Sequence, residues 1–112
     1  MSAPSYNPSV MLADRLSLSN VQIRDFCRKH HIRRLAFFGS VLRDDFGPAS
    51  DVDVLVEFEL RHVPGLLRLA AIERELSVLL GGRRVDMRTP RDLSRYFRDD
   101  VLARAVVQYA EG

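Results

Sequence analysis

The chain has 112 residues, of which 46% are hydrophobic and 29% charged, and this balance is typical of one compact globular domain. A chain of this length is too short for two independent cores, and its single core would gain stability from a partner subunit. Cys27 is the only cysteine, which excludes an internal disulfide or a cysteine-based zinc site and indicates a reducing, cytoplasmic location. The formal net charge of +2 is too small to indicate non-specific nucleic-acid binding, so no direct nucleic-acid contact is expected.

The sequence predicts neither a secretion signal nor a membrane span. Residues 1–9 carry no basic side chain, and the apolar run that follows at 10–13 is too short for a signal peptide. No stretch approaches the roughly 20 apolar residues that cross a bilayer. Lys29 is the only lysine among the 17 basic residues, which excludes mechanisms that need a phosphate-loop lysine and leaves arginine for phosphate contacts.

The first half of the chain predicts an arm, a helix, a strand and a loop. Residues 1–17 contain prolines and small polar side chains, so they are predicted to form a flexible N-terminal arm. Ser19 and Gln22 have the spacing of a capping box, which predicts a first helix of about 12 residues. The apolar run at 32–38 ends at a Gly-Ser pair, as is typical of a short buried strand. Residues 41–50 then predict one helical turn and a loop.

The second half of the chain alternates strand and helix patterns. Apolar and acidic residues alternate over 51–58, which predicts a strand, and leucines and isoleucines recur at helical spacing over 66–80. A short alternating segment at 84–88 predicts a third strand, and apolar residues at every fourth position over 93–109 predict one long or two broken helices. Residues 18–112 are therefore predicted to form one α/β (α+β) domain, with a small mixed sheet of three to four strands and helices packed on one face.

Three carboxylates occupy positions that suit a metal site. Asp51 and Asp53 lie two residues apart on a predicted strand, so their side chains leave the same face with Cα atoms about 7 Å apart. Asp86 lies in the middle of the third predicted strand and joins them if that strand pairs beside the second. Mg2+ prefers such oxygen ligands, and two ions held about 4 Å apart activate a hydroxyl and stabilise a leaving pyrophosphate.

The Gly39-Ser40 pair is a candidate phosphate-binding turn. It follows a predicted buried strand and precedes a helical turn, where glycine lets the backbone approach a phosphate and the serine hydroxyl adds a donor. Arg43 lies one turn further on and is a candidate for the same anion. A lone Gly-Ser is more typical of a plain turn and a lone Asp-x-Asp of a solvated strand end, but their combination across the loop 41–50 is a specific arrangement.

This combination resembles the signature of a known family. Residues 39–43, Gly-Ser-Val-Leu-Arg, followed by 50–56, Ser-Asp-Val-Asp-Val-Leu-Val, resemble the motif of the polymerase-beta-like nucleotidyltransferases, specifically the minimal nucleotidyltransferases. The resemblance extends from about residue 21 to residue 109 and implies a polymerase-beta-like nucleotidyltransferase core.

The resemblance also implies roles for individual residues. By it, Gly39 and Ser40 hold the phosphates of the nucleotide donor, ATP. The same resemblance implies that Asp51, Asp53 and Asp86 hold Mg2+, with two ions expected, and that Asp86 is the base toward the acceptor.

Members of this family that resemble the chain are commonly antitoxins paired with a HEPN-domain ribonuclease toxin, and some transfer AMP from ATP to a tyrosine of that toxin. The resemblance therefore implies a Mg-dependent protein adenylyltransferase that forms an oligomer with its toxin. Two alternatives remain open at this point. The chain could neutralise the toxin by binding alone, or it could transfer a nucleotide to a small hydroxylated molecule.

The three histidines do not predict a second site. His30 and His31 are adjacent at a predicted helix end, where neighbouring side chains point in different directions, so a metal site there is not expected. His62 has no paired ligand in its own turn, and the same expectation applies to it.

Overall fold

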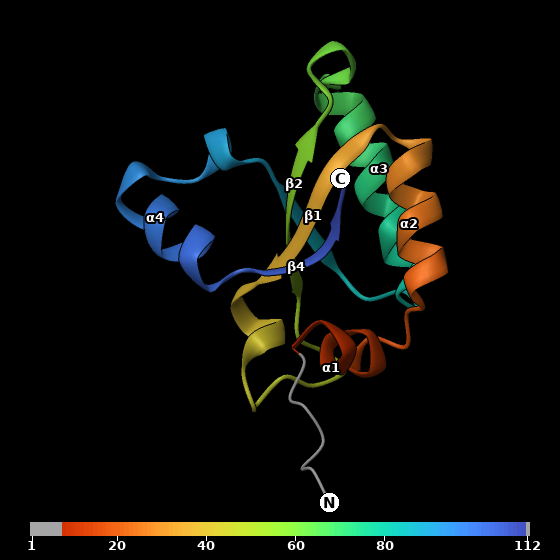
Figure 1. The fold of residues 1–112 in the computed structure, drawn as a ribbon. Helices are drawn as coiled ribbons and strands as arrows, with labels where there is room; N and C mark the ends of the chain where they lie inside the picture. The colour runs from red at the N-terminus through yellow and green to blue at the C-terminus, as the bar shows by residue number, and fades with distance from the viewer. Residues whose placement is uncertain (1–7, 112) are drawn as a thin grey trace, which may run out of the picture.

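The computed structural model describes residues 8–111 and consists of a four-stranded mixed sheet with helices around it (Figure 1). The sheet has four strands, within the predicted three to four, and their order is β3-β2-β1-β4. The strands are β1 (Ile32–Phe38), β2 (Val52–Phe58), β3 (Val85–Arg88) and β4 (Val106–Ala110). Among the residues described, no helix is both long and apolar enough to cross a membrane.

Two kinds of connection build the sheet. β1 pairs with β2 in the antiparallel direction, so the end of β1 lies beside the start of β2. β2 pairs with β3 in parallel, and helix α3 (Leu66–Leu79) makes the crossover between them. Helix α3 also supplies a hydrogen-bond partner to β3, because the carboxylate of Glu73 accepts a hydrogen bond from the backbone N–H of Met87 at 2.8 Å.

Helices α2 (Asn20–Lys29) and α3 cover one face of the sheet, as predicted, whereas α4 (Arg95–Arg104) lies on the opposite side (Figure 1). Ser19 and Gln22 form the predicted capping box at the start of α2. Val52, Val54 and Val56 of β2 are fully buried in the main core. Because side chains alternate along a strand, the residues between these valines point toward the other face.

The predicted flexible arm at residues 1–17 is wrong for the part that the structure describes, and residues 1–7 lie outside the described residues. Helix α1 (Pro8–Arg15) packs against the core, where Leu12 and Leu16 are 1% and 3% exposed. Leu16 directly follows α1, and its N–H donates to the carbonyl of Leu12 at 3.0 Å, which brings the two leucines into the core together. Burying each contributes about 1.5–3 kcal/mol. That gain outweighs the weak helix propensity of the surrounding sequence.

The predicted helix over residues 93–109 is also wrong in its second half. α4 ends at Ala105, whose φ of −59° and ψ of 140° leave the helical region, and β4 follows at once. β4 pairs with β1 in the antiparallel direction, with Tyr109 opposite Leu35 and Val106 opposite Phe37. Apolar residues at every fourth position suit a strand as well as a helix. The free edge of β1 favours the strand, because β-branched and aromatic residues fit a pleated surface.

Candidate active site

The Gly-Ser turn is fastened to the aspartate-bearing strand. β1 ends at Phe38, which pairs with Asp53, and the short 3-10 helix η1 (Gly39–Leu42) follows. The hydroxyl of Ser40 donates a hydrogen bond to the backbone carbonyl of Asp51 at 2.6 Å, and the backbone N–H of Ser40 donates to the carboxylate of Asp53. Both donors of Ser40 therefore hold η1 against the start of β2.

The three predicted aspartates come together at this edge of the sheet. Asp53 and Asp86 are direct partners in the parallel register of β2 and β3. Asp51 lies just before β2, two residues from Asp53, so its side chain leaves on the same side. This face is opposite the one that α2 and α3 cover, and it leaves the carboxylates accessible: Asp51 is exposed, and Asp53 and Asp86 are half-buried.

Asp53 has the most perturbed electrostatics of the three. Burial raises the pKa of its carboxyl above the ordinary value, and the negative charges of Asp86 and Asp51 raise it further. The hydrogen bond from the Ser40 backbone and the charge of Arg88 act in the opposite direction but do not cancel the shift. The folded state therefore disfavours the ionised carboxylate, and a cation bound nearby would relieve that repulsion.

Two arginines partly balance the carboxylates. Nε of Arg88 lies 3.1 Å from Oδ2 of Asp86, and Nε of Arg84 lies 3.9 Å from Oδ1 of Asp51. All four side chains are at least 44% exposed, so these ion pairs are weak and easily exchanged for another cation. Hard carboxylate oxygens with excess negative charge are the donor set that Mg2+ prefers, and the residues present fit such an ion.

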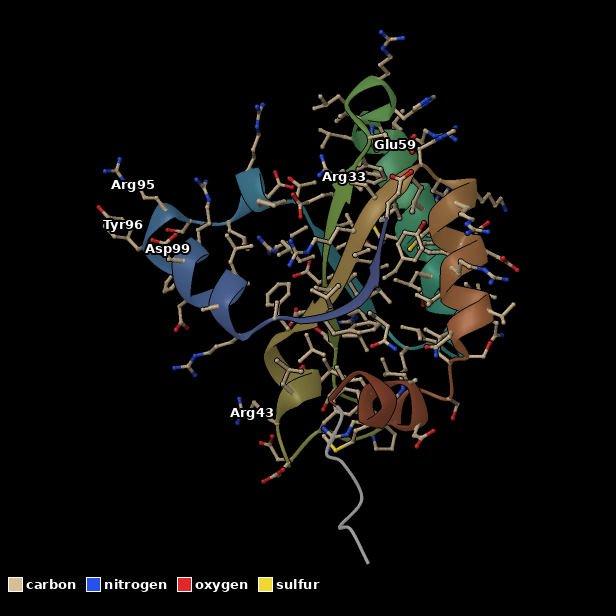
Figure 2. All side chains as sticks on the ribbon, in the orientation of Figure 1. Arg33, Arg43, Glu59, Arg95, Tyr96 and Asp99 are labelled. Atoms are coloured by element: carbon tan, nitrogen blue, oxygen red, sulfur yellow. The ribbon has the colours of Figure 1, made fainter. Side chains whose placement is uncertain are left out.

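A cavity of about 420 Å3 opens beside the turn. Gly39, Ser40 and Arg43 line it from η1, and Asp100 and Arg104 line it from α4. Arg43 is exposed, its guanidinium pairs with Asp45 at 2.9 Å, and its side chain points outward from the η1 end of the molecule (Figure 2). The guanidinium groups of Arg43 and Arg104 line the cavity and suit an anion, whereas both donors of Ser40 are bonded to the aspartate strand.

The contribution of α4 to this cavity was missed by sequence reasoning. Arg104 lies at the end of α4, and it pairs with Asp100 one turn earlier at 3.0 Å. The sequence gives no signal for its position near η1, because that position depends on the turn of the chain from α4 into β4.

Sequence reasoning also missed Arg15 of α1, whose side chain donates hydrogen bonds to the backbone at the end of η1. Its Nη1 donates to the carbonyl of Val41 at 2.7 Å and to that of Arg43 at 2.8 Å. Its guanidinium also lies 5.8 Å from the ring centre of Phe46. Arg15 therefore braces the C-terminal end of the turn and contacts the cavity lining through the backbone of Arg43.

We expect Arg15→Ala to loosen the turn and to lower the free energy of unfolding by about 1.5–3 kcal/mol or more. The substitution removes two hydrogen bonds from a charged donor, each of which contributes about 1.5–3 kcal/mol. Hydrogen exchange should speed up at the amides of residues 40–46. Arg15→Lys should restore part of the protection. Arg24→Ala is the control, because within the described part of the chain Arg24 pairs with its neighbour Asp25. Unchanged exchange in Arg15→Ala would exclude this positioning role.

Comparison with known proteins decides the family. The model of the nucleotidyltransferase domain family matches residues 21–108, which include the Gly-Ser turn, the three aspartates and β4 up to Gln108. The chain belongs to this family. This nucleotidyltransferase is 35% identical over 71 residues to the protein adenylyltransferase MntA of Thermococcus cleftensis, an alignment that covers 63% of the chain and 69% of that relative.

Solved structures show the same fold. This nucleotidyltransferase superposes on the structure of a candidate minimal nucleotidyltransferase with a TM-score of 0.66 and 33% identity, covering 92% of the chain and 98% of that structure. It also superposes on a chain of a toxin-antitoxin crystal structure with AMP-PNP, with a TM-score of 0.67. That alignment covers 83% of the chain and 74% of the other, at 18% identity. The predicted minimal nucleotidyltransferase architecture is therefore confirmed.

Proposed function

We propose that this nucleotidyltransferase is the antitoxin of a HEPN-domain ribonuclease toxin and that it transfers AMP from ATP to a tyrosine of that toxin, with Mg2+ as cofactor. The observation that carries the proposal is the meeting of Asp51, Asp53 and Asp86 beside a Gly-Ser turn that borders an anion-sized cavity. The name of the adenylyltransferase relative supports the reaction, and the toxin-antitoxin structure with AMP-PNP supports the partner and the nucleotide.

The proposed reaction assigns one task to each group. Gly39, Ser40 and the adjoining cavity hold the triphosphate, with Arg43 at its rim. Mg2+, when bound there, would neutralise phosphate charge and favour ionisation of the attacking hydroxyl. Asp51 and Asp53 hold the ions, and Asp86 completes the set and accepts the proton of the tyrosine hydroxyl. The phenolic oxygen forms a bond to the α-phosphorus while the bond to the β-phosphate oxygen breaks, and pyrophosphate leaves.

A mass measurement on the partner tests this proposal. The full chain is mixed with a candidate HEPN-domain partner, ATP and Mg2+, and the intact mass of the partner is followed. We expect a gain of one AMP group or more, which fragmentation places on tyrosine. ATP with a methylene group between the α- and β-phosphates is the matched control, because it occupies the same site but has no α–β bridging oxygen to release.

The same measurement separates the alternatives. A partner whose ribonuclease activity falls without any gain of mass would show neutralisation by binding alone. A partner that keeps both its mass and its activity, while a hydroxylated small molecule gains AMP, would show a different acceptor class. Either result would overturn the proposed transfer to the toxin.

We also propose that the pair works in the cytoplasm and without direct nucleic-acid contact by this chain. Cys27 supports the reducing compartment, because it is a free cysteine buried in the core. Burial raises the pKa of its thiol to about 12, so it stays protonated and inert at neutral pH.

A further inference from the structure

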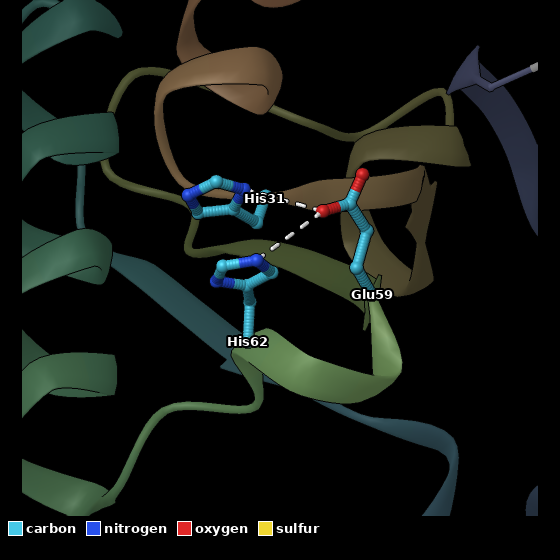
Figure 3. Close-up of side chains that lie close together, drawn as sticks. All are labelled: His31, Glu59 and His62. Atoms are coloured by element: carbon cyan, nitrogen blue, oxygen red, sulfur yellow. Dashed lines mark hydrogen bonds and ion pairs between the residues drawn. The ribbon is translucent and has the colours of Figure 1, made fainter.

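Two histidines and a glutamate meet at the end of the sheet opposite the aspartates (Figure 3). His31 directly precedes β1, Glu59 directly follows β2, and His62 closes the short 3-10 helix η2 (Leu60–His62). The antiparallel pairing of β1 and β2 brings the start of one strand to the end of the other. The sequence hides this cluster, because its histidines are far apart in the chain and come from different elements.

The three side chains offer convergent ligand atoms. Nδ1 of His31 lies 3.2 Å from Oε2 of Glu59, and Nε2 of His62 lies 4.0 Å from the same oxygen. One ligand atom from each residue lies within 4.8 Å of the other two. In a tetrahedral zinc site with bonds of about 2.0–2.1 Å, ligand atoms are about 3.4 Å apart, so the cluster is close to that spacing.

The backbone fixes these three residues relative to one another. The N–H of Glu59 donates to the carbonyl of His31 at 2.9 Å, and the N–H of His62 donates to the carbonyl of Glu59 at 2.8 Å. His31 also has a φ of 57°, in the left-handed region that is uncommon for residues other than glycine. Strained backbone of this kind occurs preferentially at functional sites, because surrounding structure must maintain it.

We propose that His31, Glu59 and His62 form a Zn2+ site in which the chain supplies three ligands and leaves a fourth position open. Two imidazole nitrogens and one carboxylate oxygen are a ligand set typical of zinc with a free position. This site is separate from the aspartate cluster and does not depend on the proposed adenylyl transfer. Its nitrogen ligands favour zinc over Mg2+, which prefers oxygen ligands alone.

The rings must rearrange when the metal binds. The imidazoles of His31 and His62 are stacked, with centroids 3.6 Å apart and planes at 8°, and an ion cannot lie in the plane of both parallel rings. The side chain of His62 is 46% exposed, so its ring is free to turn toward Glu59. Space for the fourth ligand is present, since cavities of about 490 and 360 Å3 border Glu59 on the His62 and His31 sides.

Zinc titration of the full chain, purified without a histidine tag and with Mg2+ in excess to occupy the aspartates, tests the site. Calorimetry should show one Zn2+ per chain, and Co2+ in its place should give the visible absorption of a four-coordinate ion. The ligand variants are His31→Asn, Glu59→Gln and His62→Gln; asparagine is chosen at residue 31 because it tolerates the left-handed backbone. Each should weaken Zn2+ binding by more than the roughly 10–100-fold that loss of an outer-shell partner costs.

Two neighbours provide matched controls. Glu111 lines both cavities, and His30 is adjacent to His31 but binds Glu75 instead, so Glu111→Gln and His30→Gln should keep Zn2+ binding. If the ligand variants bind Zn2+ as tightly as the parent, or if the parent binds none, the cluster is only a hydrogen-bonded ion pair between histidines and a carboxylate, and the proposal is overturned.

Discussion

Asp53→Asn should abolish nucleotide transfer and at the same time make the folded protein more stable. Asp53 is half-buried and is the direct strand partner of Asp86, so its amide replacement removes a central anion of the proposed Mg2+ site. We expect transfer to fall by at least about 100-fold. The amide is nearly the same size as the carboxyl and can still accept the hydrogen bond from the backbone of Ser40, so the turn should keep its shape.

The gain in stability follows from the sign of the pKa shift. Because the pKa of Asp53 is raised in the folded state, the folded protein holds that proton more tightly than the unfolded chain does, and stability falls as pH rises through the folded pKa. The variant lacks this penalty. Its Tm should exceed that of the parent by a few degrees at pH 7, and the difference should disappear below the ordinary carboxyl pKa of about 3.9.

Calorimetric melting across pH and an activity assay on the same samples check both parts. Asp99→Asn is the matched control, because it removes one charge from an exposed position on α4 (Figure 2). Mg2+ should raise the Tm of the parent and of this control but not that of Asp53→Asn. An Asp53→Asn protein that is as active as the parent would remove Asp53 from the proposed site.

Gly39→Ala should damage the site by displacing Asp53. Gly39 has a φ of +70°, and a Cβ at this position would overlap Oδ2 of Asp53 and lie 3.1 Å from its Cγ. The left-handed backbone costs an alanine about 1–2 kcal/mol, and the overlap adds to that cost. We expect transfer to fall about 100-fold and the free energy of unfolding to fall by about 1–3 kcal/mol.

Two other glycines separate the causes of this effect. Gly81 has a φ of +76° with nothing near its would-be Cβ, so Gly81→Ala should lose stability through backbone strain and keep its activity. Gly47 has neither a positive φ nor a close neighbour, and Gly47→Ala should change little. If Gly39→Ala and Gly81→Ala lose the same stability and both stay active, the close approach of Gly39 to the carboxylate of Asp53 is not needed for activity.

The sequence predicted the elements whose patterns are unambiguous. Strict alternation over β2, leucine periodicity over α3 and the Ser19–Gln22 capping box each have one structural solution. The Asp53–Asp86 pairing was also predictable, because a strand, a helix and a second strand usually form a parallel pair. The segment at Val106–Ala110 was not predictable, because its apolar spacing suits either a helix or a strand until the free edge of β1 is known.

The site was predictable where it depends on local sequence and unpredictable where it depends on packing. Gly39 and Ser40 adjoin their strand in the chain, so their place beside the aspartates followed from the strand pairing. Arg15, Arg104 and His62 reach their positions only through the packing of α1, the turn after α4 and the stacking of His62 on His31. The sequence patterns of their own segments do not indicate which residues they contact in the fold.

The hydrogen bonds from Ser40 to the aspartate strand join the proposed phosphate-binding turn and the carboxylate cluster into one mechanical unit. Any movement of the turn that follows nucleotide binding also shifts Asp53, and any movement of Asp53 toward a cation also shifts the turn. Thermodynamic linkage then requires that nucleotide and cation change each other's affinity by the same factor, whichever arrives first. If the proposed function holds, the occupancy of the site therefore depends jointly on the concentrations of ATP and of free divalent cation.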